Sequence, residues 1–201
     1  MQIKEMMTKV LHTVTKDTDV REALATMEQQ SIRHLPVLDQ TNSLIGILSK
    51  LDIVHMEGTV GDVMSASVIT THPTDFVEDA AAWMLDNHIH CLPVLENGEL
   101  VGIVTDTDLL HTIITLTGAN KPSSRIELEV ENEPGQLASI TAITRDLGFN
   151  IQSIFAIPGQ KYGRTRVVIR LQSMHVHKLV ETFNTEQYTV LWPPTLGADH
   201  L

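Results

Sequence analysis

Apolar residues recur at helical spacing in two stretches of the first half of the chain. They occupy the i, i+3, i+4 and i+7 positions, first as Val20, Ala23, Leu24 and Met27 and then as Val77, Ala80, Ala81 and Met84. This spacing predicts two amphipathic helices, which begin near Thr18 and near Asp75. Asp75 and Glu78 have the spacing of a capping box, so their side chains are expected to cap the second helix.

A pattern typical of a β-hairpin follows each helix. Residues 92–95 and 100–104 are apolar runs on either side of Asn97-Gly98, which is the strongest sequence signal for a type I′ turn. The equivalent runs of the first stretch flank a longer turn at residues 39–43. We therefore expect two hairpins that differ mainly in their turns.

The elements around the two hairpins also match. A short extended piece precedes each first helix, and a second helix is predicted to begin at Lys50 and at Asp106. Pro36 and Pro93 lack an N–H group, so each is expected at the start of a strand or on a sheet edge. Residues 60–64 predict a short connecting helix.

These two stretches are the halves of an internal repeat. Met7 aligns with Met64 at an offset of 57 (64 − 7 = 57), and Gly46 aligns with Gly102 at an offset of 56 (102 − 46 = 56). The difference of one residue falls in the hairpin turn, where a change of length is well tolerated. Each unit has the order β-α-β-β-α, and such tandem units usually cover each other's apolar faces.

The last third of the chain follows a different plan. Residues 119–124 are rich in turn formers and predict a linker. Strict alternation over residues 126–131 predicts a strand, and a helix follows over residues 137–147 with Gly148 at its C′ position. The remaining predicted elements are strands over 151–157 and 164–171, a helix over 174–183 and a strand over 188–192. The order βαββαβ is typical of a ferredoxin-like fold.

Arginines gather on one face of the predicted strand at residues 164–171. This face carries Arg164, Arg166 and Arg170, and the first strand is expected to place Glu127, Glu129 and Glu131 opposite them. Cross-strand ion pairs would explain both sets of charges without a bound anion.

Charge is distributed unevenly between the repeat and the last third. Residues 1–118 contain six basic and seventeen acidic residues (6 − 17 = −11), whereas residues 119–201 contain eight of each. A phosphate backbone needs a basic face, so the acidic repeat argues against a nucleic acid as partner. A small nucleotide remains compatible, because it needs only a local group of donors.

Several sequence features bear on the cellular location. No apolar run reaches the roughly eighteen residues of a transmembrane helix, so no membrane partner is expected. Residues 1–5 lack the charged-then-apolar pattern of a signal peptide. A single cysteine, Cys91, fits a reducing compartment and is expected to be a buried, unreactive thiol. Together these features predict a cytoplasmic protein.

The motif that ends each repeat carries a family resemblance. GILSKLD at residues 46–52 and GIVTDTD at 102–108 share the form G-h-h-S/T-x-x-D, and each hairpin opens with LPVL, at 35–38 and 92–95. This arrangement resembles a tandem pair of CBS domains, the Bateman module. The resemblance implies a mixed α+β and α/β architecture. Its expected parts are CBS repeats at 1–57 and 58–118, a linker at 119–124, a further domain at 125–192 and a tail at 193–201.

Ligand positions follow from this resemblance. In the family, paired repeats form two clefts that often bind an adenosine nucleotide such as AMP or ATP. The motif hydroxyls, Ser49 and Thr105, are expected at phosphate, and the motif carboxylates, Asp52 and Asp108, at the ribose hydroxyls. Further expected contacts are Arg33, His34, Lys50, Thr70 and His90.

The residues themselves leave an alternative open. Ser49 with Asp52 and Thr105 with Asp108 also have the spacing of capping boxes, which need no ligand. One side chain can have both roles. The two sites are not expected to be equal, since Lys50 follows Ser49 whereas Asp106 follows Thr105. Charge alone then favours a polyphosphate at the first motif.

Residues 125–192 resemble an ACT domain. The resemblance rests on Asn132-x-Pro134-Gly135-x-Leu137 and on Gly148-x-Asn150-Ile151 after the helix. In that family small effectors, often amino acids, bind at the turn between the first strand and helix. The expected effector residues are Asn132, Gly135, Gln136 and Leu137. The alternative is that Pro134-Gly135 only builds the turn and the domain only dimerises.

A CBS pair followed by an ACT domain resembles the AcuB-type acetoin-utilisation proteins of bacteria. The resemblance implies a regulatory protein that senses an adenosine nucleotide and acts on an unknown protein partner, as a homodimer formed through its CBS or ACT domains. Neither a catalytic set of residues nor a metal-ligand spacing is found, so no enzyme activity and no required cofactor are expected. The alternatives are a ligand-free scaffold and an uncharacterised enzyme.

Overall fold

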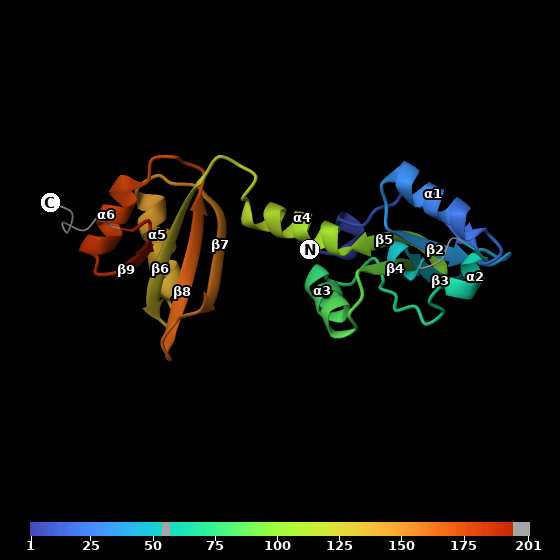
Figure 1. The fold of residues 1–201 in the computed structure, drawn as a ribbon. Helices are drawn as coiled ribbons and strands as arrows, with labels where there is room; N and C mark the ends of the chain where they lie inside the picture. Colours follow the sequence, from blue (N-terminus) through green and yellow to red (C-terminus); the bar gives the residue numbers. More distant parts are fainter. Residues whose placement is uncertain (54–56, 195–201) are drawn as a thin grey trace. The chain divides into compact units, whose positions relative to one another are not determined.

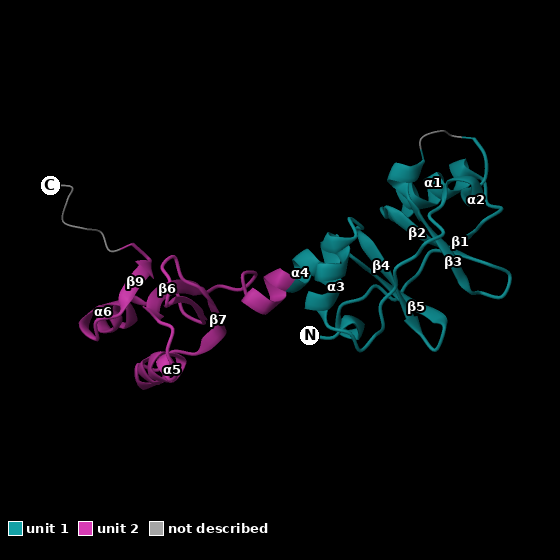
Figure 2. Ribbon diagram, turned by 90° about the horizontal axis from the view of Figure 1, so that it is seen from below, with its two compact units in different colours: residues 1–112 teal, residues 113–201 magenta. Residues whose placement is uncertain are grey.

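The computed structural model describes residues 1–53 and 57–194. The chain forms two compact units, residues 1–112 and residues 113–201. The first unit contains both repeats, and the second contains the ferredoxin-like domain (Figures 1 and 2).

The first repeat is built on a three-stranded sheet in the order β1-β2-β3. Its elements are β1 (Val14–Thr15), α1 (Val20–Gln30), β2 (His34–Leu38), β3 (Leu44–Ser49) and the 3-10 turn η2 (Lys50–Asp52). Val20, Ala23 and Met27 of α1 are buried, as their helical spacing predicts. The helix predicted from Lys50 is limited in the described residues to the single turn η2, and residues 54–56 lie outside them.

The second repeat has a two-stranded sheet, β4-β5. Its elements are the connecting helix α2 (Val60–Val63), α3 (Val77–Asp86), β4 (Cys91–Glu96), β5 (Glu99–Thr105) and α4 (Asp106–Thr117). Asn97 and Gly98 have φ values of 54° and 84°, as a type I′ turn requires, so the predicted hairpin is confirmed.

Two local predictions are wrong. Asp75 does not cap α3; its carboxylate accepts hydrogen bonds from the Thr71 hydroxyl and the His72 N–H. The first N–H of α3, on Val77, donates instead to the carbonyl of Met1. Pro36 lies inside the central strand β2 and not at its start or on an edge. Its missing N–H is tolerated because pairing with β1 begins only at the next residue, Val37.

The repeats exchange their first segments. The turn η1 (Ile3–Glu5) precedes the first repeat, yet Ile3 is fully buried in the core of the second repeat against Val77 and Leu92. In return, Val60 of α2 is fully buried in the core of the first repeat. Paired backbone bonds mark the crossing points: Thr8 bonds Ile103 of β5, and Ser65 bonds Ile47 of β3.

The second unit is a four-stranded antiparallel sheet in the order β7-β8-β6-β9. Helices α5 and α6 cover one of its faces (Figure 1), and Ile140, Leu179 and Phe183 of these helices are buried in its core. The elements are β6 (Ser124–Glu131), α5 (Gln136–Asp146), β7 (Ile151–Pro158), β8 (Arg164–Leu171), α6 (His177–Thr185) and β9 (Thr189–Trp192). This order confirms the ferredoxin-like prediction, although α6 begins three residues later than expected.

Charge pairing on the open face of this sheet follows the prediction only in part. Arg164 pairs with Glu131 at 3.0 Å, and Arg166 pairs with Glu127 at 3.4 Å. Arg170 does not face a glutamate: the strand register places it opposite Arg125, and its guanidinium donates to the Ser123 hydroxyl. Alternation along a strand fixes which residues share a face, but it allows the pairing of two strands to shift by two residues. The observed register between β6 and β8 therefore decides which charges meet.

Candidate functional site

The first unit contains two related cavities. We call them the Thr105 cavity, of about 220 Å³, and the Ser49 cavity, of about 340 Å³. Each of the 13 residues that line the Thr105 cavity has its repeat partner in the lining of the Ser49 cavity. For example, Thr105 and Asp108 correspond to Ser49 and Asp52. The internal repeat of the sequence is therefore also a repeat of the site.

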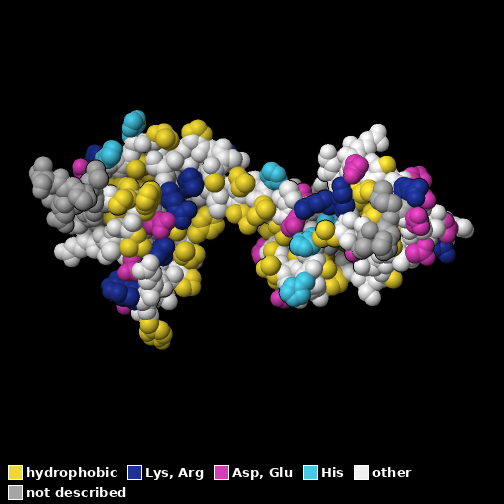
Figure 3. Space-filling model, in the orientation of Figure 1, with side chains coloured by type: hydrophobic (Ala, Val, Ile, Leu, Met, Phe, Trp, Pro, Cys, Tyr) yellow, Lys and Arg dark blue, Asp and Glu magenta, His cyan; other side chains and the backbone are white. Residues whose placement is uncertain are grey.

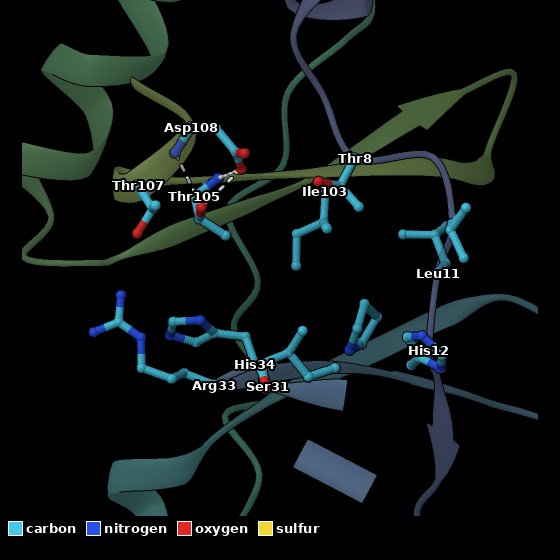
Figure 4. A pocket seen from close by; sticks show the side chains of 13 residues that line it. Thr8, Leu11, His12, Ser31, Arg33, His34, Ile103, Thr105, Thr107 and Asp108 are labelled. Carbon is cyan, nitrogen blue, oxygen red and sulfur yellow. Dashed lines mark hydrogen bonds between the residues drawn. The ribbon is translucent and has the colours of Figure 1, made fainter. Parts of the chain in front are cut away.

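Each cavity draws residues from both repeats. Arg33 and His34 point toward Thr107 and Thr105 across the Thr105 cavity (Figure 4). His34 also lines the Ser49 cavity, together with His90 of the other repeat. This convergence follows from the strand register, because His34 is paired with Ser49 and Cys91 with Thr105 at the ends of the two hairpins.

The motif residues form the capping contacts that their spacing permits. Thr105 donates to Asp108 Oδ2 from its backbone N–H at 2.8 Å and from its hydroxyl at 2.7 Å (dashed lines in Figure 4). Ser49 N–H donates to Asp52 Oδ2 at 2.9 Å. The same four side chains line the cavities. Capping and cavity lining thus coexist, and ligand contact by these residues stays a prediction.

The carboxylate of Asp106 contacts one basic lining residue of each cavity, although Asp106 itself is part of neither lining. Asp106 Oδ1 is 3.2 Å from Arg33 Nη2, and Asp106 Oδ2 is 3.3 Å from His90 Nδ1. Burial alone would raise the pKa of Asp106, but the Thr107 N–H and the charges of Arg33 and His90 hold it below its usual value. Asp106 therefore carries its negative charge at neutral pH.

Two expected contacts lie elsewhere. Lys50 Nζ is 3.2 Å from Glu28 Oε1, and Lys50 is not part of either cavity lining. Thr70 also lines neither cavity. The charge argument that favoured a polyphosphate at the Ser49 motif loses its premise, since the cation that does line a cavity, Arg33, lies at the Thr105 motif.

Burial changes the pKa values of two side chains that line the cavities, His34 and Cys91. The pKa of His34 is lowered mainly by burial and further by the neighbouring charge of Arg33, which favours the neutral imidazole. Burial raises the pKa of Cys91 to about 12, with smaller contributions from Asp106 and Asp52. The Cys91 thiol is therefore protonated and unreactive, as expected from the sequence.

Sequence reasoning missed the contribution of the exchanged segments. Thr8, Leu11 and His12 line the Thr105 cavity, and Ser65 and Val68 line the Ser49 cavity. The offset of 57 pairs Thr8 with Ser65 and Leu11 with Val68 (65 − 8 = 57; 68 − 11 = 57). This match was visible in the sequence, but only the backbone bonds to β5 and β3 reveal which motif each segment faces.

The second unit has a cavity of about 320 Å³ at the turn between β6 and α5. Its lining includes all four residues expected at an effector site, Asn132, Gly135, Gln136 and Leu137. Gly135 has a φ of 96°, so the turn needs glycine for its backbone conformation. The four residues thus lie together in one cavity lining at this turn. Binding of an effector by them stays a prediction.

Across residues 1–53 and 57–194, no three His, Cys, Asp or Glu side chains lie close enough together to hold a metal ion. Among the helices of the same residues, none has the length and apolar character needed to cross a bilayer.

Comparison with family models agrees with this geometry. Residues 3–57 and 60–115 each match the CBS domain, and residues 126–190 match the AHAS small subunit-like ACT domain. The chain spans less than half the length of the first curated relatives it matches, the uncharacterized protein MJ1225 of Methanocaldococcus jannaschii among them. That relative is 27% identical over 118 residues, and this chain covers 42% of it.

Solved structures resemble the first unit. A putative acetoin utilization protein (AcuB) from Vibrio cholerae is 30% identical with a TM-score of 0.55, over 60% of this chain and 95% of that one. The CBS domain pair of protein MJ0100, in complex with 5′-methylthioadenosine and S-adenosyl-L-methionine, is 28% identical with a TM-score of 0.55, over 60% and 98%.

CBSX2 in complex with AMP is 26% identical with a TM-score of 0.53, over 56% of this chain and 96% of that one. Together with the paired cavities, these matches identify the first unit. The chain belongs to the CBS-domain family, with a tandem CBS pair followed by an ACT domain of the AHAS small-subunit type.

Proposed function

We propose that the CBS pair is a regulatory module that binds an adenosine-containing small molecule in the Thr105 and Ser49 cavities. The observation that carries this proposal is the residue-by-residue correspondence of the two cavity linings, each with one hydroxyl and one carboxylate of the repeated motif. The AMP complex of CBSX2 and the 5′-methylthioadenosine and S-adenosylmethionine complex of MJ0100 support it.

The lining of the Thr105 cavity suits a nucleoside. Leu11, Ile32 and Pro36 offer apolar surface to a base. Asp108 uses Oδ2 for the cap, which leaves Oδ1 to accept hydrogen bonds from the hydroxyls of a ribose. A ligand that contacts both sides of the cavity would link the first repeat to the second and so favour one arrangement of the pair.

Replacement of the motif carboxylates tests this proposal. Asp108→Asn and Asp52→Asn each remove the charge that would bind the ribose, so affinity for AMP and for 5′-methylthioadenosine should fall by about tenfold or more at the affected cavity, as for loss of a charged hydrogen bond. Isothermal titration calorimetry measures this change. Loss of the signal from both cavities is expected in the double variant.

The chain offers a matched control for the effect on capping. Asp62 accepts hydrogen bonds from the Thr59 N–H and hydroxyl, both at 2.8 Å, in the same arrangement as Asp108, but it lines neither cavity. Asp62→Asn should leave nucleotide affinity unchanged. Unchanged affinity in the Asp52 and Asp108 variants would show that the motif carboxylates serve only as caps.

The cellular role is proposed at a finer level from similarity. The likeness to the putative acetoin utilization protein of Vibrio cholerae supports a part in acetoin or acetate catabolism. Regulation of a protein partner by a homodimer, without catalysis by this chain, completes the proposal. A ligand-free scaffold is the alternative. Failure of AMP, ADP, ATP, 5′-methylthioadenosine and S-adenosylmethionine to raise the thermal stability at millimolar concentration would favour the scaffold.

A small effector at the ACT domain is a second candidate function. The cavity at the β6–α5 turn supports it, since Asn132 and Gln136 supply polar groups beside the apolar Leu137 and Val167. A thermal-shift screen with amino acids tests this site. The stabilisation by any positive compound should be lost in Asn132→Ala and retained in Asn184→Ala, which alters an asparagine on α6 outside this cavity.

A further inference from the structure

Asp106 contacts the basic side chain that borders each cavity. Its two oxygens lie 3.2 Å from Arg33 Nη2 and 3.3 Å from His90 Nδ1. Arg33 lines the Thr105 cavity, His90 lines the Ser49 cavity, and the two residues are repeat partners (90 − 33 = 57). One carboxylate therefore engages the same position of both repeats.

Donors at the start of α4 are also engaged within the chain. The N–H groups of residues 105–108 donate in order to Asp108 Oδ2, the His90 carbonyl, Asp106 Oδ1 and Thr105 Oγ1. A helix start ordinarily offers such N–H groups to a phosphate. Here a phosphate would meet two carboxylates, Asp106 and Asp108, in place of free donors.

The basic side chains His34 and Arg33 at the Thr105 cavity do not offset the negative charge of Asp106 and Asp108. The pKa of His34 is lowered by burial and by Arg33, so its imidazole adds no positive charge at neutral pH. Arg33 is thus opposed by Asp106 and Asp108. Figure 3 shows acidic, basic and histidine side chains next to one another on the visible face of the first unit. Arg33, Asp106 and Asp108 supply one positive and two negative charges, so the site lacks the excess of positive charge that suits phosphate.

We propose that Asp106 makes the CBS pair select adenosine compounds with an uncharged or cationic 5′ group over adenosine 5′-phosphates. The inference rests on the proposed function and specifies the class of its ligand. A 5′-phosphate must compete with Asp106 for Arg33 or His90 and is repelled by the same carboxylate. A thioether or sulfonium group at the 5′ carbon meets neither obstacle, and a sulfonium is attracted to Asp106.

The test compares AMP with 5′-methylthioadenosine, which share adenosine and differ at the 5′ group. Titration calorimetry of the full chain at low ionic strength should show tighter binding of 5′-methylthioadenosine. In Asp106→Asn the affinity for AMP should rise about tenfold, as expected for one charge at a partly exposed site, while that for 5′-methylthioadenosine changes by less than about twofold. Added salt should reduce the gain for AMP.

Two further variants make the comparison specific. Asp106→Ser keeps an oxygen that can accept from the Thr107 N–H and should give the same change of preference if the asparagine variant folds poorly. Asp62→Asn removes a capping charge of the first unit outside both cavities and should change neither affinity.

The outcomes separate this inference from the proposed function. An equal ratio of AMP to 5′-methylthioadenosine affinities in the native protein and in both Asp106 variants would overturn the role of Asp106 while the proposed function stands. Tighter binding of AMP than of 5′-methylthioadenosine by the native protein would overturn it as well. Binding of neither compound at millimolar concentration would overturn the proposed function and this inference together.

Discussion

His34 is the one basic residue that lines both cavities within the described part of the chain. Burial and the charge of Arg33 lower its pKa in the folded state, whereas in the unfolded chain a histidine titrates near a pKa of about 6.5. As the pH falls through that value, the unfolded chain takes up a proton that folded His34 does not. The free energy of unfolding therefore decreases as the pH falls.

We predict that His34→Gln makes the stability of the CBS pair less dependent on pH between pH 7 and pH 5. Urea denaturation can follow this unit by the fluorescence of Trp83 in a Trp192→Phe background, because the chain has two tryptophans. His72→Gln, which alters an exposed histidine that lines neither cavity, should retain the native slope. An unchanged slope in His34→Gln would contradict the prediction.

Single residues were predictable from the sequence where local spacing decides their contacts. The pairs Thr105–Asp108 and Ser49–Asp52 cap their helix starts because a separation of three residues suffices for that geometry. Lys50 shows the limit of such reasoning. Lys50 is next to Ser49 along the chain, but this does not determine where the Lys50 side chain points. The Lys50 ammonium group pairs with Glu28 of α1.

At the scale of elements, the motif glycines mark the contact between each hairpin and the exchanged segment. A Cβ added to Gly102 would lie 2.6 Å from Met7 Sδ and 3.3 Å from the Thr8 carbonyl oxygen. A Cβ added to Gly46 would lie 2.6 Å from Sδ of Met64, the repeat partner of Met7. Glycine at both positions therefore gives room to the methionine side chain and backbone of another segment and does not serve a special backbone angle.

Gly102→Ala should destabilise the CBS pair by about 1–3 kcal/mol, the usual cost of overpacking a buried site. Combination with Met7→Ala should recover part of this loss, because the shorter side chain frees the space. A double-mutant cycle from urea denaturation measures the coupling. Additive effects of the two substitutions would mean that Gly102 and Met7 are not in contact.

Element boundaries were predictable where a turn or cap is encoded locally. Asn97-Gly98 defined the second hairpin, and Gly148 defined the end of α5. The start of α3 could not be predicted from local sequence, because its first N–H, on Val77, donates to the carbonyl of Met1, 76 positions earlier (77 − 1 = 76). The equivalent donor of α1, on Val20, bonds the carbonyl of Gly58.

At the scale of the whole molecule, the exchange of first segments makes the two repeats one folding unit. Ile3 has no exposed surface and belongs to the core of the second repeat, although it precedes the first. The N–H groups of Ile3 and Lys4 also bond the carbonyls of Asp75 and Pro73. Loss of this segment would therefore open the core of the distant repeat.

Ile3→Ala should lower the stability of the CBS pair by about 2–5 kcal/mol, as for other fully buried aliphatic side chains. Trp83 fluorescence in the Trp192→Phe background reports this transition from α3, a helix of the second repeat. Val10→Ala, at a side chain with 77% exposure in the same segment, should change it by less than about 0.5 kcal/mol. A native denaturation midpoint for Ile3→Ala would show that the segment is dispensable to that core.

The sequence by itself determined the internal repeat, the two fold plans, the hairpins and the motif residues, because each depends on local periodicity, turn chemistry or self-similarity. Tertiary structure alone decided that each cavity combines both repeats, that Arg33 and His90 share Asp106, and that Lys50 and Thr70 lie outside the linings. The physical reason is that these contacts join residues from different elements of the chain: 73 positions separate Arg33 from Asp106, 22 separate Glu28 from Lys50 and 16 separate His90 from Asp106 (106 − 33 = 73; 50 − 28 = 22; 106 − 90 = 16). Their partners are set by strand register and segment exchange, which local patterns do not encode.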